Sequence, residues 1–200
     1  MTRRSAQVRL DDLLRTAVEV IVERGFGNTR TADVAKAAGV SQALVFYHFS
    51  TKEALLTQAF AYAAERDLEK LQAVVDARIS PTEKLRRLVR LLAPQGRSNS
   101  WLIWIDGWAE SLRNPDLERL SRRLDLRWKE ALVEVITAGV DDGSFKCDDP
   151  AGSAWRLNCL IDGLAVQLMV HDKAISRRQA ADWMRLGAAR EVGLDPADLV

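Results

Sequence analysis

The stretch 29–52 constrains the fold of this 200-residue chain more than any other part of it. Val34 and Ala38 lie one helical turn apart and Gly39 follows them, as expected where a helix ends in a left-handed glycine cap. Ser41 then offers a capping hydroxyl to a second short helix. Two short helices joined by a glycine-containing turn predict a helix-turn-helix unit.

Amphipathic helices are expected to support this unit on both sides. Before it, apolar residues recur at helical spacing between Leu10 and Val22, which is the pattern of one helix face. After it, Ser50 and Glu53 form a capping-box pattern that opens a helix reaching about Ala77. No linker interrupts the sequence here, so we expect this long helix to belong to both halves of the chain.

Several residue groups stand at fixed spacing in this region, over about a quarter of the chain. They are Gly25-Phe26, Thr29, Val34-Ala35, Ala38-Gly39-Val40-Ser41, Tyr47-His48-Phe49, Lys52-Glu53 and Leu55. Together they resemble the N-terminal DNA-binding domain of the TetR (tetracycline repressor) family. Phe46 stands where that family often has tyrosine, so a hydroxyl that commonly meets a DNA phosphate is missing here.

Three further segments lie in the second half of the chain. They are Trp104-Ile105-Asp106-Gly107-Trp108-Ala109-Glu110, Asn114-Pro115-Asp116-Leu117 and Asp162-Gly163-Leu164. They resemble the C-terminal half of the BetI-like group of TetR-family regulators. The resemblance implies a region that binds a small molecule and forms a dimer.

The fold class expected is all-α, because no segment alternates with period two for long enough to form a strand. We expect an N-terminal arm and helix-turn-helix DNA-binding domain over 1–52, and a ligand-binding and dimerisation domain over 53–200. Residues 1–9 are expected to be a mobile basic arm. The expected helices span about 10–24, 29–38, 42–48, 51–77, 81–92, 100–113, 115–140, 151–171 and 177–191.

Charge adds a small argument for DNA binding. Residues 1–52 hold eight Lys and Arg against five Asp and Glu, an excess of three, whereas the whole chain has a net charge of +1. A basic N-terminal part is attracted to phosphates, but an excess of this size does not make the case alone.

The remaining composition points to a cytoplasmic protein without cofactor or metal. Cys147 and Cys159 have no paired or metal-ligand spacing with His48 or His171, so reduced thiols are expected. The basic N-terminus lacks the apolar segment of a secretion signal, and no apolar run approaches the ~20 residues of a membrane span.

The second helix of a helix-turn-helix enters the major groove with its N-terminal residues at the base edges. The expected base-reading residues are therefore Gln42, Ala43 and Leu44. The helix terminus and the resemblance together indicate phosphate contacts at Thr29, Arg30, Tyr47, His48 and Lys52. The alternatives are core packing for Ala43 and Leu44, a packed or capping role for His48 and a solvated surface lysine at Lys52.

An effector pocket is expected in the C-terminal region. Its candidate residues are Trp101, Trp104, Ile105, Trp108, Asn158 and Asp162. An aromatic wall can stack on an organic cation, and Asp106 could balance the charge, but a fatty or aromatic ligand fits the same residues. The alternatives are core packing for the tryptophans and structural hydrogen bonds for the polar residues, Gln167 included.

A dimer interface is expected on the last two long helices, because they show little polar face and an apolar helix must be covered. A second copy of the chain would cover it in a two-fold dimer. The candidate residues are Trp155, Leu164, Leu168, Trp183 and Met184.

The function expected is that of a ligand-responsive transcriptional regulator, a repressor that binds a palindromic DNA operator as a homodimer and is released by a small-molecule effector. No membrane partner is expected. The alternatives are an all-helical enzyme, against which the absence of a nucleophile–base or phosphate-loop signature speaks, and an architectural DNA-binding protein without an effector. The effector, the operator, the regulated genes and the choice between repression and activation are left open.

Overall fold

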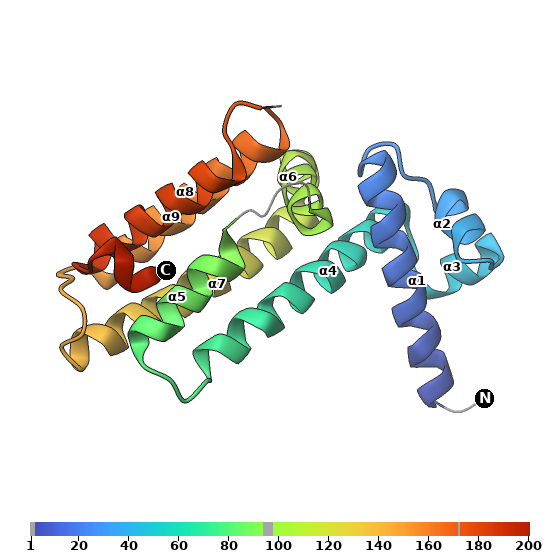
Figure 1. Cartoon of the computed structure of the whole chain (residues 1–200). Coiled ribbons are helices and arrows are strands. Elements are labelled where there is room, and N and C mark those ends of the chain that lie inside the picture. The colour runs from blue at the N-terminus through green and yellow to red at the C-terminus, as the bar shows by residue number, and fades with distance from the viewer. Residues whose placement is uncertain (1–2, 94–97, 172) are drawn as a thin grey trace. The chain divides into compact units, whose positions relative to one another are not determined.

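A computed structural model describes residues 3–93, 98–171 and 173–200, and every regular element within these ranges is helical (Figure 1). The all-α prediction is therefore confirmed. The elements are α1 (Arg3–Arg24), α2 (Thr31–Ala37), α3 (Gln42–His48), α4 (Lys52–Val75), α5 (Pro81–Leu92), α6 (Asn99–Ser111), α7 (Pro115–Asp141), α8 (Pro150–Met169), α9 (Arg177–Val192) and the 3₁₀ turn η1 (Pro196–Leu199).

The first helix begins earlier than its apolar pattern indicates. The predicted arm over 1–9 is wrong from Arg3 onward, because α1 starts there, and residues 1–2 lie outside the described ranges. The segment from Arg3 to Leu10 has no glycine or proline and contains good helix formers such as arginine, alanine and glutamine. Helix propensity thus extends α1 beyond the stretch in which apolar residues recur at helical spacing.

The chain divides into two compact units, and the division does not follow the expected domain boundary at residue 52. The first unit comprises Met1–Arg66 and Leu102–Leu124, and the second comprises Asp67–Trp101 and Asp125–Val200. The boundary passes through α4, α6 and α7. Most of α6 therefore belongs to the same compact unit as the helix-turn-helix, and not to the unit that contains the last helices of the chain.

The first unit contains the helix-turn-helix as its sequence signals predict. Gly39 has a φ of +66°, and the Ser41 hydroxyl accepts a 3.2 Å hydrogen bond from the backbone N–H of Leu44. Val45 and Phe49 are buried, which confirms that they belong to the core. Their burial fixes which side of α3 faces outward.

The second unit ends in the antiparallel pair α8 and α9, which lie side by side (Figure 1). A Cβ on Gly187 would lie only 2.5 Å from a Leu160 methyl carbon, so glycine allows the two helices to approach closely. Arg156 and Glu191 join them by a 2.7 Å ion pair. Among the described helices, none combines the length and the apolar character needed to cross a membrane.

Candidate DNA-binding and effector sites

The outer face of α3 carries exposed polar and aromatic side chains. Gln42 and Ala43 are exposed, and so are Phe46 (47%) and Tyr47 (82%). An exposed hydrocarbon ring and a phenol on so short a helix leave a surface suited to contact with another molecule. Two of the three predicted base-reading residues lie on this face.

Leu44 has a mixed position. It is half-buried, and together with His48 it lines an open groove beside α1, where Asp12 and Arg15 form the opposite wall. The structure therefore gives Leu44 and His48 partial packing roles while leaving part of each side chain accessible.

Gln42 is oriented by a neighbour on α2. Its Nε2 donates a 3.0 Å hydrogen bond to the hydroxyl of Thr31, which is buried. The amide keeps its oxygen and its second N–H, and these are the two groups that a bidentate contact with adenine requires. Thr31 is absent from the residues that the sequence predicts for the site, because no local pattern ties the start of α2 to the start of α3.

The turn between α1 and α2 corrects one prediction. Thr29 is completely buried, and its hydroxyl donates a 2.8 Å hydrogen bond to the carbonyl of Gly25. The prediction of a phosphate contact at Thr29 is therefore wrong for this conformation, because the side chain closes the turn. Arg30, the next residue, is exposed at the start of α2.

Lys52 also takes part in this turn. Its ammonium group donates a 3.1 Å hydrogen bond to the carbonyl of Gly27, and the residue is half-buried. Lys52 thus joins the beginning of α4 to the turn, and this structural contact accompanies any contact that it makes with DNA.

An aromatic cluster connects α6 with the core of the first unit. Phe60 is fully buried, and its ring meets Trp104 edge to face at 4.9 Å and Phe26 at 6.2 Å. Trp104 is buried, and its ring centroid lies 5.9 Å from that of Trp108. Trp104 is therefore a core residue rather than a pocket wall, whereas Trp101, Ile105 and Trp108 are half-buried.

Asp106 makes a hydrogen bond within the protein. Its carboxylate accepts a 2.7 Å hydrogen bond from the backbone N–H of Phe26. The structural alternative thus holds for Asp106, which is not a counter-charge waiting for a ligand. Gln167, the other polar residue left open between the two roles, is exposed.

A polar cluster lies between α7 and α8 in the second unit. Asn158 is buried, and its Nδ2 donates to Asp162 at 2.9 Å and to Asp125 at 3.4 Å. Asp125 also pairs with Lys129, whose ammonium lies 3.9 Å from the centre of the Trp155 ring. Asn158 and Asp162, both predicted as pocket residues, are therefore held in a network within the protein.

Burial raises the pKa of Asp162 to about 7, because a charged carboxylate is poorly solvated there. The nearby carboxylate of Asp125 contributes to this increase in pKa, and Lys129 partly offsets it. Asp125 and Lys129 complete this network, and the sequence analysis did not predict their part in it. The sequence pattern that could have indicated them is a pair of opposite charges four residues apart on the apolar side of α7.

The predicted dimer surface is only partly accessible. Trp155 (51%) and Trp183 (44%) are exposed large apolar side chains on α8 and α9, and Leu168 is half-buried. Leu164 and Met184 are buried within the chain's own core. Their assignment to a contact surface is wrong, because an all-apolar helix pattern does not separate internal from external packing.

Comparison with known proteins identifies the family. Residues 13–59 match the N-terminal region of the bacterial regulatory proteins of the tetR family, and residues 81–193 match the C-terminal region of BetI-type transcriptional repressors. The second match alone covers more than half of the chain. The chain belongs to the TetR family.

Named members of the TetR family show the same relationship. A BetI regulator from Stenotrophomonas maltophilia is 32% identical over 124 residues, a region that spans 60% of this chain and 63% of that relative, slightly less than two thirds. The KstR2 repressor of Mycolicibacterium smegmatis is 30% identical over 70% of this chain and 69% of its own length. Both relatives are named as helix-turn-helix transcriptional regulators.

A solved structure extends the similarity to nearly the whole fold. A transcriptional regulator from Saccharomonospora viridis, determined in complex with choline, superposes with a TM-score of 0.84 at 28% identity. The alignment covers 94% of this chain and 98% of that protein. The TetR-family N-terminal match contains α2 and α3, and the BetI-type match contains all of the predicted pocket residues.

Proposed function

We propose that this TetR-family regulator binds a palindromic operator as a homodimer, represses transcription there and is released by a small-molecule effector. The observation that carries the proposal is the outer face of α3, where Gln42 and Ala43 stand exposed on a rigidly packed helix-turn-helix. A helix presented in this way fits the major groove of DNA. The part of the chain over 53–200 then serves effector binding and dimer formation.

The roles on DNA divide between sequence reading and positioning. Gln42, Ala43 and the accessible part of Leu44 read base edges. Arg30, Tyr47, His48 and Lys52 contact phosphates, which hold the helix in place without reading sequence. Arg30 and Tyr47 are the most accessible of these four side chains, which supports their role.

The homodimer uses α8 and α9. Trp155, Trp183 and Leu168 supply apolar surface that a second copy would cover, and an isologous interface presents the same patch twice. A two-fold dimer matches a palindromic operator, with half-sites roughly 34–36 Å apart or a multiple of that distance.

The effector that we propose is an organic cation of the quaternary ammonium class. The support is the choline complex of the Saccharomonospora viridis regulator, whose fold covers nearly all of this chain. Tryptophan rings bind such cations through their faces. Trp101 and Trp108 are the half-buried aromatic candidates on α6.

The experiment that tests the proposal is selection of random duplex DNA by the purified protein at near-physiological salt. Recovery of one palindrome supports a dimeric, sequence-specific regulator. Choline is then titrated into the complex with the selected DNA, and release of the DNA supports the effector class. A protein that enriches no sequence contradicts operator binding, whereas an operator complex unaffected by choline contradicts only the choice of effector.

Two substitutions separate the roles on DNA. Gln42→Ala should change the preferred base at one position of each half-site, with a discrimination loss of about 1–3 kcal/mol, because a bidentate base contact is removed.

Arg30→Ala should weaken binding to all sequences alike and lower the salt slope of log K by about 1 per DNA-contacting arginine. Both effects are measured by fluorescence anisotropy over a salt series.

Arg30 is a cleaner test than Lys52, whose ammonium also holds the Gly27 carbonyl. Replacement of Ala109, which is exposed on α6, by serine provides a control that should bind as the wild type does. If the Gln42 and Arg30 variants lose affinity equally on every sequence, the division between reading and positioning does not hold.

A further inference from the structure

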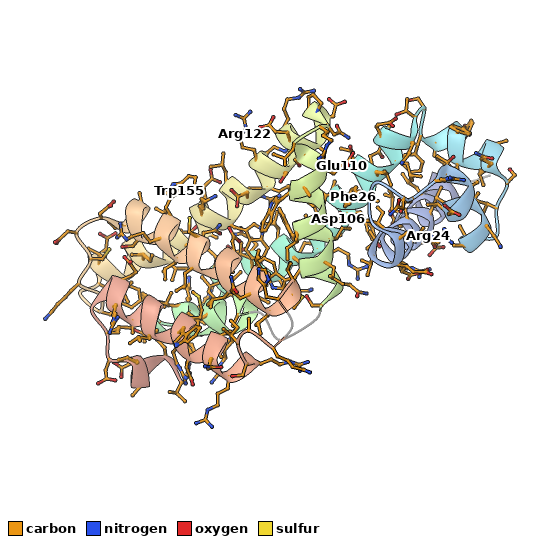
Figure 2. The ribbon with its side chains drawn as sticks, turned by 90° about the horizontal axis from the view of Figure 1, so that it is seen from above. Arg24, Phe26, Asp106, Glu110, Arg122 and Trp155 are labelled. Carbon is orange, nitrogen blue, oxygen red and sulfur yellow. The ribbon has the colours of Figure 1, made fainter. Side chains whose placement is uncertain are left out.

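Asp106 of α6 is bonded to the turn that precedes the helix-turn-helix, and Figure 2 shows Asp106 next to Phe26. The hydrogen bond from the Phe26 N–H to Oδ2 is 2.7 Å long and joins residues 80 positions apart. Gly25 lies against the same oxygen, which would be 3.3 Å from a Cβ built on that glycine. A carboxylate bonded to a backbone N–H forms one of the stronger hydrogen bonds in proteins.

The turn that Asp106 holds through Phe26 is itself hydrogen-bonded to the residues just before α2. Gly25 has a φ of +81°, and its carbonyl accepts from both the N–H and the hydroxyl of Thr29, at 3.1 and 2.8 Å. Thr29 has no solvent exposure, so its position is determined by its neighbours. The turn that Asp106 holds therefore sets where α2 begins.

The first residue of α2, Thr31, is hydrogen-bonded to the first residue of α3, Gln42. Thr31 follows Thr29 by two residues, is buried, and accepts the hydrogen bond from Nε2 of Gln42. Gln42 is the polar residue at the N-terminus of the recognition helix. A continuous set of contacts thus runs from the carboxylate on α6 to this side chain, all within the first compact unit.

We infer that Asp106 is a positioning residue for DNA recognition, which holds the α1–α2 turn so that Thr31 keeps the Gln42 amide aimed at the bases. The inference rests on the proposed operator binding by α3. It makes sequence discrimination depend on a residue of the BetI-type region, 64 positions after the residue that reads the base. A movement of α6 would then change which sequence is preferred as well as how tightly DNA is bound.

The test measures discrimination between the selected operator and an operator altered at the base pair that Gln42→Ala identifies. Asp106→Ala should reduce the discrimination ratio by about tenfold, within the range of a lost bidentate base contact. Asp106→Asn should retain it, because an amide oxygen can accept from the Phe26 N–H. Glu110→Ala, which removes a carboxylate one helical turn farther along α6, is the matched control and should behave as the wild type does.

A double variant decides whether the two residues act together. Asp106→Ala should cost no further discrimination in a Gln42→Ala background, because the side chain that it positions is absent. Additive losses would overturn the inference. An equal loss of affinity on all sequences would overturn it as well, since that result describes a purely structural contact.

A DNA-free measurement keeps this inference separate from the proposed function. In Asp106→Ala the Phe26 amide should exchange with solvent about tenfold to a hundredfold faster, and the side-chain amide signals of Gln42 should shift in NMR spectra. Asp106→Asn should restore both. Unchanged Gln42 signals in Asp106→Ala would overturn the inference even if an operator is found, whereas failure to select DNA would contradict only the proposed function.

Discussion

Replacement of Asp162 by asparagine should raise the free energy of unfolding by about 4 kcal/mol at pH 8 and by less than about 1 kcal/mol at pH 4. The pKa of this carboxyl rises from its ordinary value of 3.8 to about 7 in the folded protein, chiefly through burial. The amide that replaces it has nearly the same size, carries no charge and can still accept the hydrogen bond from Asn158.

The direction in which stability changes with pH follows from which state, folded or unfolded, binds the proton of Asp162. Between pH 4 and pH 7 the folded protein keeps the proton of Asp162, whereas the unfolded chain releases it, so the folded state binds more protons. Stability contributed by this group is therefore complete below about pH 4 and declines as the pH rises to about 7. Above that range the carboxylate is charged in both states, and the full cost of its burial beside Asp125 is present.

Urea unfolding monitored by tryptophan fluorescence at both pH values provides the measurement. Asp148→Asn is the matched control, because that carboxyl is exposed and its removal should change stability little at either pH. Equal stabilisation by Asp162→Asn at pH 4 and pH 8 would show that folding does not raise the pKa of this carboxyl.

Replacement of Phe60 by alanine should lower the free energy of unfolding by about 3–5 kcal/mol, the range for a fully buried aromatic side chain. Phe60 has no solvent exposure and touches rings from two other segments, Phe26 after α1 and Trp104 on α6. Gly107 lies against the same ring, since a Cβ there would be 2.7 Å from its edge. The cavity left by the substitution would therefore loosen α6 from the helix-turn-helix.

The control is Phe46→Ala, the same substitution on the outer face of α3. Phe46 is 47% exposed, so its removal should change stability by no more than about 0.5 kcal/mol while affecting DNA binding. Thermal unfolding of both variants at one protein concentration compares them. A loss below about 1 kcal/mol for Phe60→Ala would mean that the cluster does not contribute to the core as its burial indicates.

Local signals were sufficient for the turn between α2 and α3 and for the orientation of α3. Gly39 and Ser41 determine the turn and the start of α3 through backbone conformation and capping, which depend on neighbouring residues only. The spacing of Val45 and Phe49 likewise indicates which side of α3 is buried. From this the outward position of Gln42 and Ala43 follows without a tertiary structure.

Local signals did not predict which apolar residues of a helix are buried within the chain and which are exposed, because both kinds recur at the same helical spacing. Trp104 and Trp108 stand on the same apolar stretch, but only Trp104 is buried, because Phe60 happens to lie against it. Met184 and Trp183 are neighbours in the sequence, yet one is internal and the other is exposed. Periodicity describes the apolar face of a helix and carries no information on which molecule covers it.

The helices, the helix-turn-helix and the family can all be inferred from the order of the amino acids, because caps, turns and helical spacing act over a few residues. The roles of the acidic residues depend instead on how the helices pack. Asp106 accepts a hydrogen bond from Phe26, 80 positions away, and the pKa of Asp162 depends on its burial and on Asp125 from another helix. The strength of a carboxylate's interactions is determined by burial and by partners distant in the chain, and these exist only once the helices have packed.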